Sequence, residues 1–255
     1  MIHATDKQWK IWGKINPYFG VLSTDEYKNI SLDDEKKKKF FESGDRHIEY
    51  VMSIINNYID PSFKPKLCLD FGCGVGRIII PLAYRFSHVT GVDISQDMLD
   101  EASRNCVELG LNNVELVESD DNLSKLHGKY DFIHSTIVFQ HINPKRGEVL
   151  FKRLVDLLDD GGVGVIHLTY YARQTNTRKT INWMKYNIPY LENIVNIFKG
   201  RSFYFPSMQM HMYKLNNVFS ILQDNGCEHM CVRFSNHGGV WGIRLYFQKS
   251  NVGIY

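Results

Sequence analysis

The sequence lacks the long apolar runs that would place it in a membrane or mark it for export. No stretch approaches the ~18 consecutive apolar residues that indicate a transmembrane helix. The N-terminal segment MIHATDKQWKIWGK also lacks the apolar core of a secretory signal peptide. We therefore expect no membrane span, and we expect the protein to be cytoplasmic.

The sequence contains few cysteines, and none of them are spaced as a metal-binding or redox pair. The 255 residues include five cysteines, and none of them forms a C-x-x-C pair. This pattern gives no indication of a zinc site or of redox chemistry, and no acidic metal triad is assigned by motif. We predict reduced, mostly buried thiols and no metal.

The formal net charge is only +2, which gives no general indication of nucleic-acid binding. The one basic run, residues 36–39, follows three acidic residues and precedes Phe40 and Phe41. This order is typical of the exposed side of a helix, which we expect to continue to Tyr58. An RNA-binding surface would need aromatic residues interleaved with basic ones over a longer stretch, so we expect no nucleic-acid partner.

The most informative segment is LCLDFGCGVGR, residues 67–77. A short apolar strand ends at Asp70 and is followed by Gly72, Gly74 and Gly76, and then by an apolar stretch suited to a buried helix. Glycines in this turn permit positive φ and let a ligand lie against the backbone, although a glycine-rich turn without a ligand would have the same local sequence. The strand and helix around the turn favour the binding site.

The spacing of the glycines is G-x-G-x-G, whereas dinucleotide-binding turns have G-x-G-x-x-G. With Asp70, the pattern resembles the first motif of class I S-adenosylmethionine-dependent methyltransferases. The ligand of that family carries a cationic amino group and no phosphate. An acidic residue beneath the loop is suited to such a cation.

A second apolar strand, residues 88–94, contains Asp93 near its end. A carboxylate at this place can accept hydrogen bonds from two ribose hydroxyls, in nicotinamide enzymes and methyltransferases alike. Asp93 or Ser95 can instead cap the helix that follows, and the two roles can coexist.

The next two strands end in polar residues as well. Residues 114–118 are followed by Ser119, Asp120, Asp121 and Asn122, where the resemblance implies an acidic side chain that accepts the adenine amino group. Asp120 is the preferred candidate and Asp121 the second, while a polar turn without a ligand is the alternative. The fourth strand, residues 130–135, leads into a segment that resembles the corresponding part of the family.

These features predict an α/β fold of the Rossmann-like, three-layer kind. A fifth strand is expected at residues 163–169, and a final hairpin pairs residues 227–234 with 241–248 across a glycine-rich loop. The resemblance covers residues 65–170 well and implies a mostly parallel seven-stranded sheet with an antiparallel last strand. We divide the chain into an N-terminal helical extension or lid, residues 1–60, and a core, residues 61–255, with an inserted cap at about 171–211.

The resemblance implies S-adenosylmethionine as cofactor and S-adenosylhomocysteine as product. Arg46 is suited to the methionine carboxylate, although an ordinary exposed arginine is the alternative. The residues expected to form the cofactor site are Asp70, Gly72, Cys73, Gly74, Gly76, Arg77, Asp93, Ile94, Met98, Asp120, Asp121, Asn122, Ser135 and Arg46.

The insertion is rich in aromatic, methionine and basic residues, including Arg178, Lys179, Trp183 and Tyr186. It leaves the carboxyl end of the fifth strand, so it starts at the edge of the sheet where the cofactor is expected. A lid that excludes water is one interpretation, and a packing or homodimer surface is the other.

Transfer of a methyl group to a hydroxyl requires a base, and histidine titrates in the right pH range. His237, in the final hairpin loop, is the first candidate. His141 and Tyr170 follow, and His141 is equally suited to a structural hydrogen-bonding role.

We therefore expect a methyltransferase that acts on a hydroxyl, or less readily an amine, of a small molecule or glycan precursor. The alternatives are a catalytically silent methyltransferase-like binding subunit and an NAD-dependent oxidoreductase.

Overall fold

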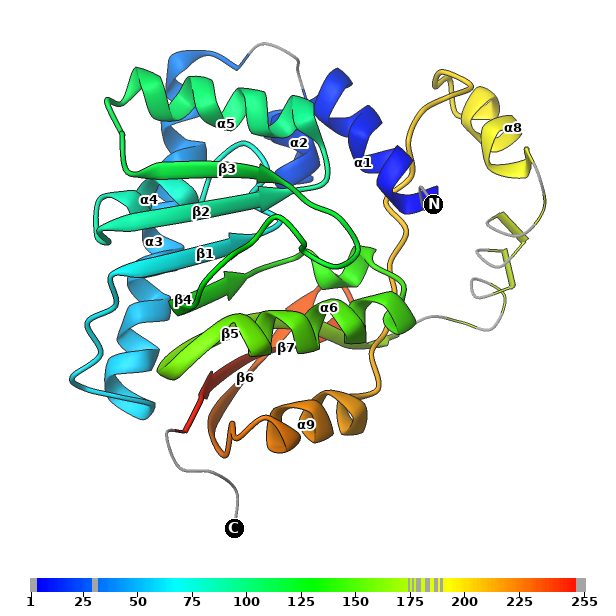
Figure 1. Ribbon diagram of the computed structural model, residues 1–255. Coiled ribbons are helices and arrows are strands. Elements are labelled where there is room, and N and C mark those ends of the chain that lie inside the picture. Colours follow the sequence, from blue (N-terminus) through cyan, green and yellow to red (C-terminus); the bar gives the residue numbers. More distant parts are fainter. Residues whose placement is uncertain are drawn as a thin grey trace.

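The computed structural model describes residues 4–28, 32–173, 175, 177, 180–181, 184–185, 188 and 190–250. Its elements surround one twisted seven-stranded sheet with the order β3-β2-β1-β4-β5-β7-β6 (Figure 1). Four of the basic and aromatic residues named in the insertion, Arg178, Lys179, Trp183 and Tyr186, lie outside the described residues.

Five strands form the parallel part of the sheet. They are β1 (Leu67–Phe71), β2 (His88–Asp93), β3 (Val114–Glu118), β4 (Tyr130–Ser135) and β5 (Leu158–Ala172). All carboxyl ends of these strands therefore lie at one edge of the sheet, where ligands of open α/β folds bind.

The sheet is completed by the hairpin of β6 (His229–His237) and β7 (Val240–Gln248). β7 runs antiparallel to both β5 and β6. The predicted α/β Rossmann-like fold with an antiparallel last strand is confirmed. β5 is longer than the predicted 163–169 at both ends, because Leu158 pairs with Tyr130 of β4 and the pairing with β7 extends as far as Ala172.

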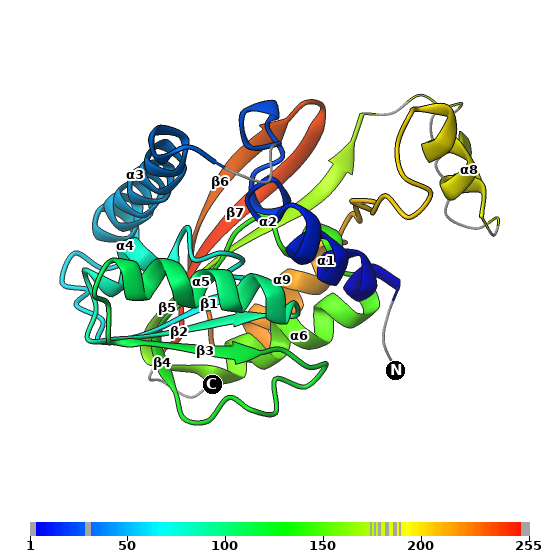
Figure 2. The same cartoon turned by 90° about the horizontal axis from the view of Figure 1, so that it is seen from above.

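Helices cover both faces of the sheet, as the view from above shows (Figure 2). α3 (Asp34–Tyr58), α4 (Ile79–Ala83) and α5 (Gln96–Glu108) lie on one face, and α6 (Pro144–Leu157) and α9 (Leu215–Asp224) on the other. Residues of each strand alternate between the faces. Cys68, Phe132 and Tyr246 thus pack beneath the first set of helices, and Leu69, Ile133 and Phe247 beneath the second.

Two short helices, α1 (Ala4–Ile15) and α2 (Pro17–Val21), lie above the carboxyl ends of the strands. They pack on α3 and α5 through a cluster that includes Trp12, Phe40 and Met98. The Tyr18 hydroxyl donates to Glu101 on α5 at 2.7 Å, and burial raises the pKa of Tyr18 above its usual value. The N-terminal helices are thus fixed to the edge of the sheet where the glycine-rich turn lies.

The described residues also form two short 3₁₀ turns, η1 (Asp25–Tyr27) and η2 (Phe139–His141), and helix α8 (Leu191–Phe198). Within the described ranges, none of the helices combines the length and hydropathy that crossing a bilayer requires.

The segment after the insertion is attached to the core by Tyr213. Its hydroxyl lies 3.0 Å from the Phe139 carbonyl and 2.9 Å from the Ile142 carbonyl, and the side chain is buried. Gly147, in the first turn of α6, makes room for this ring, because an added Cβ would lie 1.9 Å from the Tyr213 hydroxyl oxygen.

We expect Gly147→Ala to destabilise the protein by about 1–3 kcal/mol, because overpacking displaces Tyr213. In an unobstructed helix the same change would stabilise by roughly 0.5–1 kcal/mol. Urea denaturation would measure the difference. Adding Tyr213→Phe, which removes the nearest atom, should make the Gly147→Ala change less costly; an equal cost in both backgrounds would contradict this account.

Candidate cofactor and acceptor site

The turn between β1 and α4 has the backbone that its glycines predict. Gly72, Gly74 and Gly76 have φ angles of 79°, 54° and 90°, so the predicted positive φ is confirmed at all three. The N–H groups of Gly72 and Cys73 donate to the Val92 carbonyl at 2.7 and 3.0 Å, which fixes the turn to the end of β2.

The glycines are closely covered. A Cβ on Gly72 would lie 2.2 Å from a methyl group of Val138, and one on Gly74 would lie 2.4 Å from a methyl group of Val21. A Cβ on Gly76 would instead lie 3.5 Å from the Ala102 Cβ, so this glycine packs against α5. The turn is therefore lined by side chains of α2 and of the segment after β4.

Asp93, at the end of β2, is held by backbone N–H groups from two segments. Gly74 donates to one carboxylate oxygen at 3.0 Å and Ser95 to the other at 2.9 Å. Burial raises the pKa of Asp93 to about 6, against the lowering effect of these hydrogen bonds. A carboxylate has about four acceptor positions, so Asp93 keeps capacity for hydroxyl groups in the cavity that it lines. Ser95 caps α5 by accepting from the Met98 N–H, so the predicted capping is also present.

Asp70 is buried and belongs to a chain of three side chains. Its carboxyl lies 2.7 Å from His134 Nδ1 on β4, and His134 Nε2 lies 2.9 Å from His47 Nε2 on α3. Burial raises the pKa of Asp70 to about 7 and lowers the pKa of His134 to about 3. Both shifts favour an uncharged pair, in which the carboxyl group is protonated and the imidazole is neutral.

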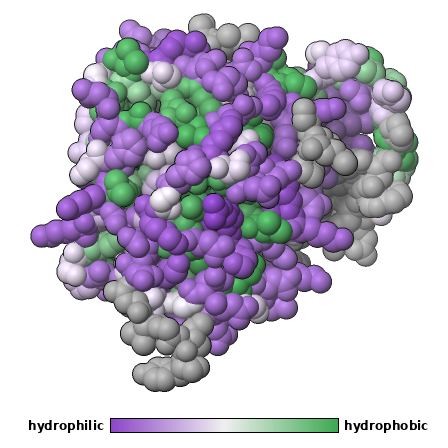
Figure 3. Space-filling model, viewed as in Figure 1, coloured by the Kyte–Doolittle hydropathy of each residue, from purple (hydrophilic) through white to green (hydrophobic). Residues whose placement is uncertain are grey.

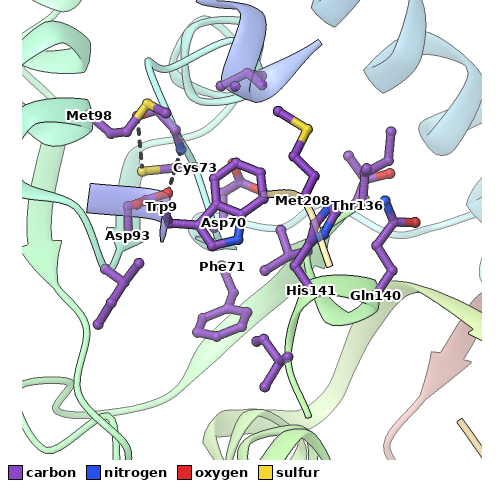
Figure 4. Close-up of a pocket in the computed structure, with 18 of the residues that line it drawn as sticks. Trp9, Asp70, Phe71, Cys73, Asp93, Met98, Thr136, Gln140, His141 and Met208 are labelled. Carbon is purple, nitrogen blue, oxygen red and sulfur yellow. Dashed lines mark hydrogen bonds between the residues drawn. The ribbon is translucent and has the colours of Figure 1, made fainter. Parts of the chain in front are cut away.

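These elements enclose a cavity of about 500 Å³, within the range of roughly 300–1,000 Å³ that small-molecule sites have. Figure 4 shows Asp93, Cys73 and Met98 on one side and Thr136, Gln140, His141 and Met208 on the other, with Asp70 and Trp9 between them. Of the predicted cofactor residues, those that line the cavity are Asp70, Gly72, Cys73, Gly74, Arg77, Asp93, Ile94 and Met98.

Other predicted cofactor residues lie outside the cavity lining. The Asp120 carboxylate accepts from Asn122 N–H and Ser124 N–H in its own loop, and Asp121 pairs with Arg146 at 2.6 Å. Ser135 Oγ donates to the Phe71 carbonyl. Their roles stay predictions.

Two further candidates are also placed away from the lining. Arg46 is largely exposed and lies 3.8 Å from Glu42, and Tyr170 packs against the core cluster beneath α6 and α9. Gly76, as described above, contacts α5.

The wall opposite Asp93 contains a strained residue. Ile137 has a φ of 63°, a conformation that β-branched residues rarely adopt and that costs on the order of 1–3 kcal/mol. It lies between Thr136 and Val138, and all three line the cavity. The segment after β4 is thus held in one specific conformation at the site.

His141 lines this wall with both ring nitrogens engaged. Nδ1 lies 2.8 Å from the Gln209 carbonyl, and Nε2 lies 3.0 Å from the Gln140 side-chain nitrogen. The carbonyl accepts from Nδ1–H, so Nε2 accepts from the Gln140 amide. Burial lowers the pKa of His141 to about 4, and the ring is neutral.

His237 lies at the end of β6, is exposed, and also lines the cavity. Its ring packs edge-on against His167, with centroids 5.6 Å apart. Among the described residues, no side chain or backbone group makes a hydrogen bond to the His237 ring. The structure therefore brings His237 and His141 to one cavity.

Sequence analysis did not identify several lining residues. Trp9 and Asp6 come from α1, Gly20 to Thr24 from α2 and its end, and Met208 and Met210 from the segment after the insertion. No local sequence pattern indicates that these segments meet the glycine-rich turn. Among the described residues, no group of three or more histidine, cysteine, aspartate or glutamate side chains is arranged to hold a metal ion.

We expect His134→Phe to make stability fall as the pH rises from 5 to 8. The folded-state pKa of Asp70 is raised, so its protonated form is favoured by folding, and this contribution is lost as the pH rises through about 7. Without His134, the ionised carboxyl has no imidazole partner. Urea denaturation across this pH range would test the expectation.

The control is the double variant Asp70→Asn/His134→Phe, which has no buried acid at this position and should not show the fall. An equal pH dependence in both variants would mean that Asp70 does not titrate as described.

Part of the chain matches a known protein family. Residues 68–162 match the family described as "Methyltransferase domain". The chain is 28% identical over 215 residues to the magnesium-protoporphyrin O-methyltransferase of Synechocystis sp., which covers 83% of this chain and 85% of that protein.

Solved structures show the same fold. The magnesium protoporphyrin IX methyltransferase from Synechocystis with bound S-adenosylhomocysteine superposes with a TM-score of 0.63 at 19% identity, over 96% of this chain and 100% of that one. The phosphoethanolamine N-methyltransferase 2 of Haemonchus contortus in complex with S-adenosylmethionine gives a TM-score of 0.56 at 14% identity, over 80% and 53%.

The cavity fits S-adenosylmethionine, because the half-buried Asp93 carboxylate has spare acceptor positions and lines the cavity beside the glycine-rich backbone. Residues 68–162 match the methyltransferase domain family, and the fold of the chain is that of solved S-adenosylmethionine-dependent methyltransferases.

Proposed function

We propose that the protein is a methyltransferase that transfers the methyl group of S-adenosylmethionine to a hydroxyl oxygen of a small molecule. A hydroxyl of a glycan precursor and an amine are the alternative acceptors. The observation that carries the proposal is the imidazole of His237, which lines the cavity without a hydrogen-bonding partner among the described residues. One relative that matches 83% of the chain is an O-methyltransferase, which also favours oxygen as the acceptor atom.

The cofactor would occupy the side of the cavity at the ends of β1 and β2. Asp93 would accept hydrogen bonds from the ribose hydroxyls, and Ile94 and Met98 would contact the adenine ring. Asp70 lies beneath the turn, where we predict the cationic amino group of the methionine moiety. The cofactor supplies an electrophilic methyl group on a sulfonium sulfur, so the protein has to align the acceptor and remove its proton.

The acceptor would occupy the other side, among Thr136, Ile137, Met208 and Met210. Most of the area exposed in this cavity is apolar, which favours an acceptor with a substantial apolar surface. His237 would take the hydroxyl proton as the methyl group is transferred. His141, with both nitrogens engaged, would position the wall that the acceptor contacts.

The N-terminal helices and the insertion would act as covers. Residues 20–24 lie over the glycine turn, and residues 208 and 210 lie at the acceptor side. We propose that residues 1–60 are the lid over the cofactor and that residues 171–211 cap the acceptor. Cytoplasmic location and a homodimer are further predictions of the sequence.

One experiment distinguishes the proposed function from an NAD-dependent oxidoreductase and from a catalytically silent binding subunit. Calorimetric titration with S-adenosylmethionine, S-adenosylhomocysteine and NAD should show binding of the first two only. Binding of NAD alone would indicate an oxidoreductase. Binding of the first two followed by no turnover with any small hydroxyl compound or amine would support the silent subunit.

We expect Asp93→Ala to weaken S-adenosylhomocysteine binding at least about tenfold, because hydrogen bonds to charged groups contribute roughly 1.5–3 kcal/mol each. Wild-type affinity should also fall as the pH drops below about 6, where Asp93 becomes protonated. Calorimetry between pH 5 and 8 would measure both effects.

Asp97→Ala is the matched control, since Asp97 is an exposed acid at the start of α5 and does not line the cavity. Asp93→Asn should bind weakly with little pH dependence. Unchanged affinity in folded Asp93→Ala would remove the ribose role.

We expect His237→Ala to lower the chemical rate about 10²–10⁴-fold at neutral pH, with cofactor affinity unchanged. His229→Ala, at the other end of β6 and also exposed, should leave the rate unchanged. Single-turnover kinetics with an acceptor found by screening would separate chemistry from binding. A His237→Ala enzyme with the wild-type rate and pH profile would exclude this base.

A further inference from the structure

Helix α8 has its polar and apolar sides reversed. The Asn196 side chain is 5% exposed and donates to the Phe205 carbonyl at 3.0 Å, and Asn193 donates to the Phe203 carbonyl at 2.8 Å. The outward residues are Ile194, Ile197 and Phe198, which are 45%, 57% and 87% exposed. A surface helix of a globular domain normally has the opposite arrangement.

The exposed apolar residues of α8 continue into its surroundings. Tyr190, immediately before the helix, and Tyr204, after it, are 70% and 75% exposed. Figures 1 and 2 show α8 held away from the sheet and its covering helices, and Figure 3 shows hydrophobic residues at this outer edge. We name the set of Tyr190, Ile194, Ile197, Phe198 and Tyr204 the α8 surface. Contiguous exposed apolar residues of this kind mark a binding surface.

The charge of this region differs from that of the rest of the chain. Residues 171–211 contain six lysine or arginine residues and one glutamate, whereas the whole chain has a formal net charge of only +2. The remainder of the chain is therefore net acidic. Lys199 directly follows α8, and Arg201 lies against the Phe205 ring, 4.7 Å from its centroid. The only acid, Glu192, already pairs with Lys185 at 3.1 Å.

Apolar side chains bordered by basic residues match an anionic lipid bilayer. A second copy of the chain would bring two basic segments together, and a nucleic acid would not need the exposed aliphatic residues. An eight-residue helix is only about 12 Å long and lies in the interface rather than spanning the bilayer. We infer that the α8 surface docks this enzyme on membranes that contain anionic lipids.

The α8 surface is linked to the acceptor side of the cavity by a short stretch of chain. The chain runs from α8 through Phe205, which packs on Trp12 with ring centroids 5.3 Å apart, to Met208 and Met210 in the cavity wall. Docking would therefore hold the acceptor side of the cavity close to the lipid surface.

The test is co-sedimentation of the full chain with vesicles of phosphatidylcholine alone and with phosphatidylglycerol added. We expect binding to the mixed vesicles, weakened by high salt. Ile197→Ser/Phe198→Ser should reduce the binding at least about tenfold, since both apolar side chains lose their burial. Lys199→Glu should reduce it roughly fivefold or more.

Val149→Ser is the matched control, because Val149 on α6 is 59% exposed and lies outside the α8 surface. Its vesicle binding should equal that of the wild type. All variants should keep the wild-type melting temperature and S-adenosylhomocysteine affinity, since none of these residues lines the cavity. A variant that melts early would be replaced by Phe198→Ser alone.

Three results would overturn the inference. They are no binding of the wild type to mixed vesicles, equal binding by the α8 variants and Val149→Ser, and equal binding to both vesicle types. Light scattering of the same samples tests whether two copies of the chain associate through the α8 surface. If the wild type is a dimer that does not bind vesicles, and Ile197→Ser/Phe198→Ser is a monomer, the α8 surface serves self-association instead.

Discussion

The site depends on backbone hydrogen bonds that join the end of β1 to the end of β2. The N–H groups of Gly72 and Cys73 donate to the Val92 carbonyl, and the Gly74 N–H donates to Asp93. These bonds require positive φ at Gly72 and Gly74, so the glycine turn and the ribose-binding candidate form one unit. The α2 segment and the Val138 wall pack directly on this unit.

Burial of polar groups is the second feature shared by the functional regions. Asp70 and Asp93 both lie where the apolar strands end, and burial raises the pKa of each acid. A hydrogen bond with His134 and backbone N–H groups replace the hydrogen bonds with water, which allows these two acidic side chains to lie in a mostly apolar cavity. Inward-facing polar groups are also hydrogen-bonded in α8, where Asn193 and Asn196 donate to backbone carbonyls. The apolar side chains of this helix therefore lie on the surface.

Several predictions from the sequence agree with the structure because they depend on short-range patterns. The strands at 114–118 and 130–135, the helix to Tyr58 and the closing hairpin follow from alternation, capping and glycine turns. The extra length of β5 was missed, because residues 170–172 are held by pairing with β7, about 70 residues further along the chain. Asp120 satisfies its carboxylate in its own loop, a local alternative that the sequence pattern did not distinguish from ligand binding.

By itself, the sequence determined the class of fold, the glycine turn and the place of Asp93, because each depends on residues adjacent in the chain and on the geometry of parallel strands. Only the tertiary structure decided which distant segments enclose the cavity. Trp9, Val21, Met208 and His237 reach it from parts of the chain separated by up to about 230 residues, and His47 reaches Asp70 only through His134. Such contacts depend on how helices and the insertion pack on the sheet, and no local pattern encodes that packing.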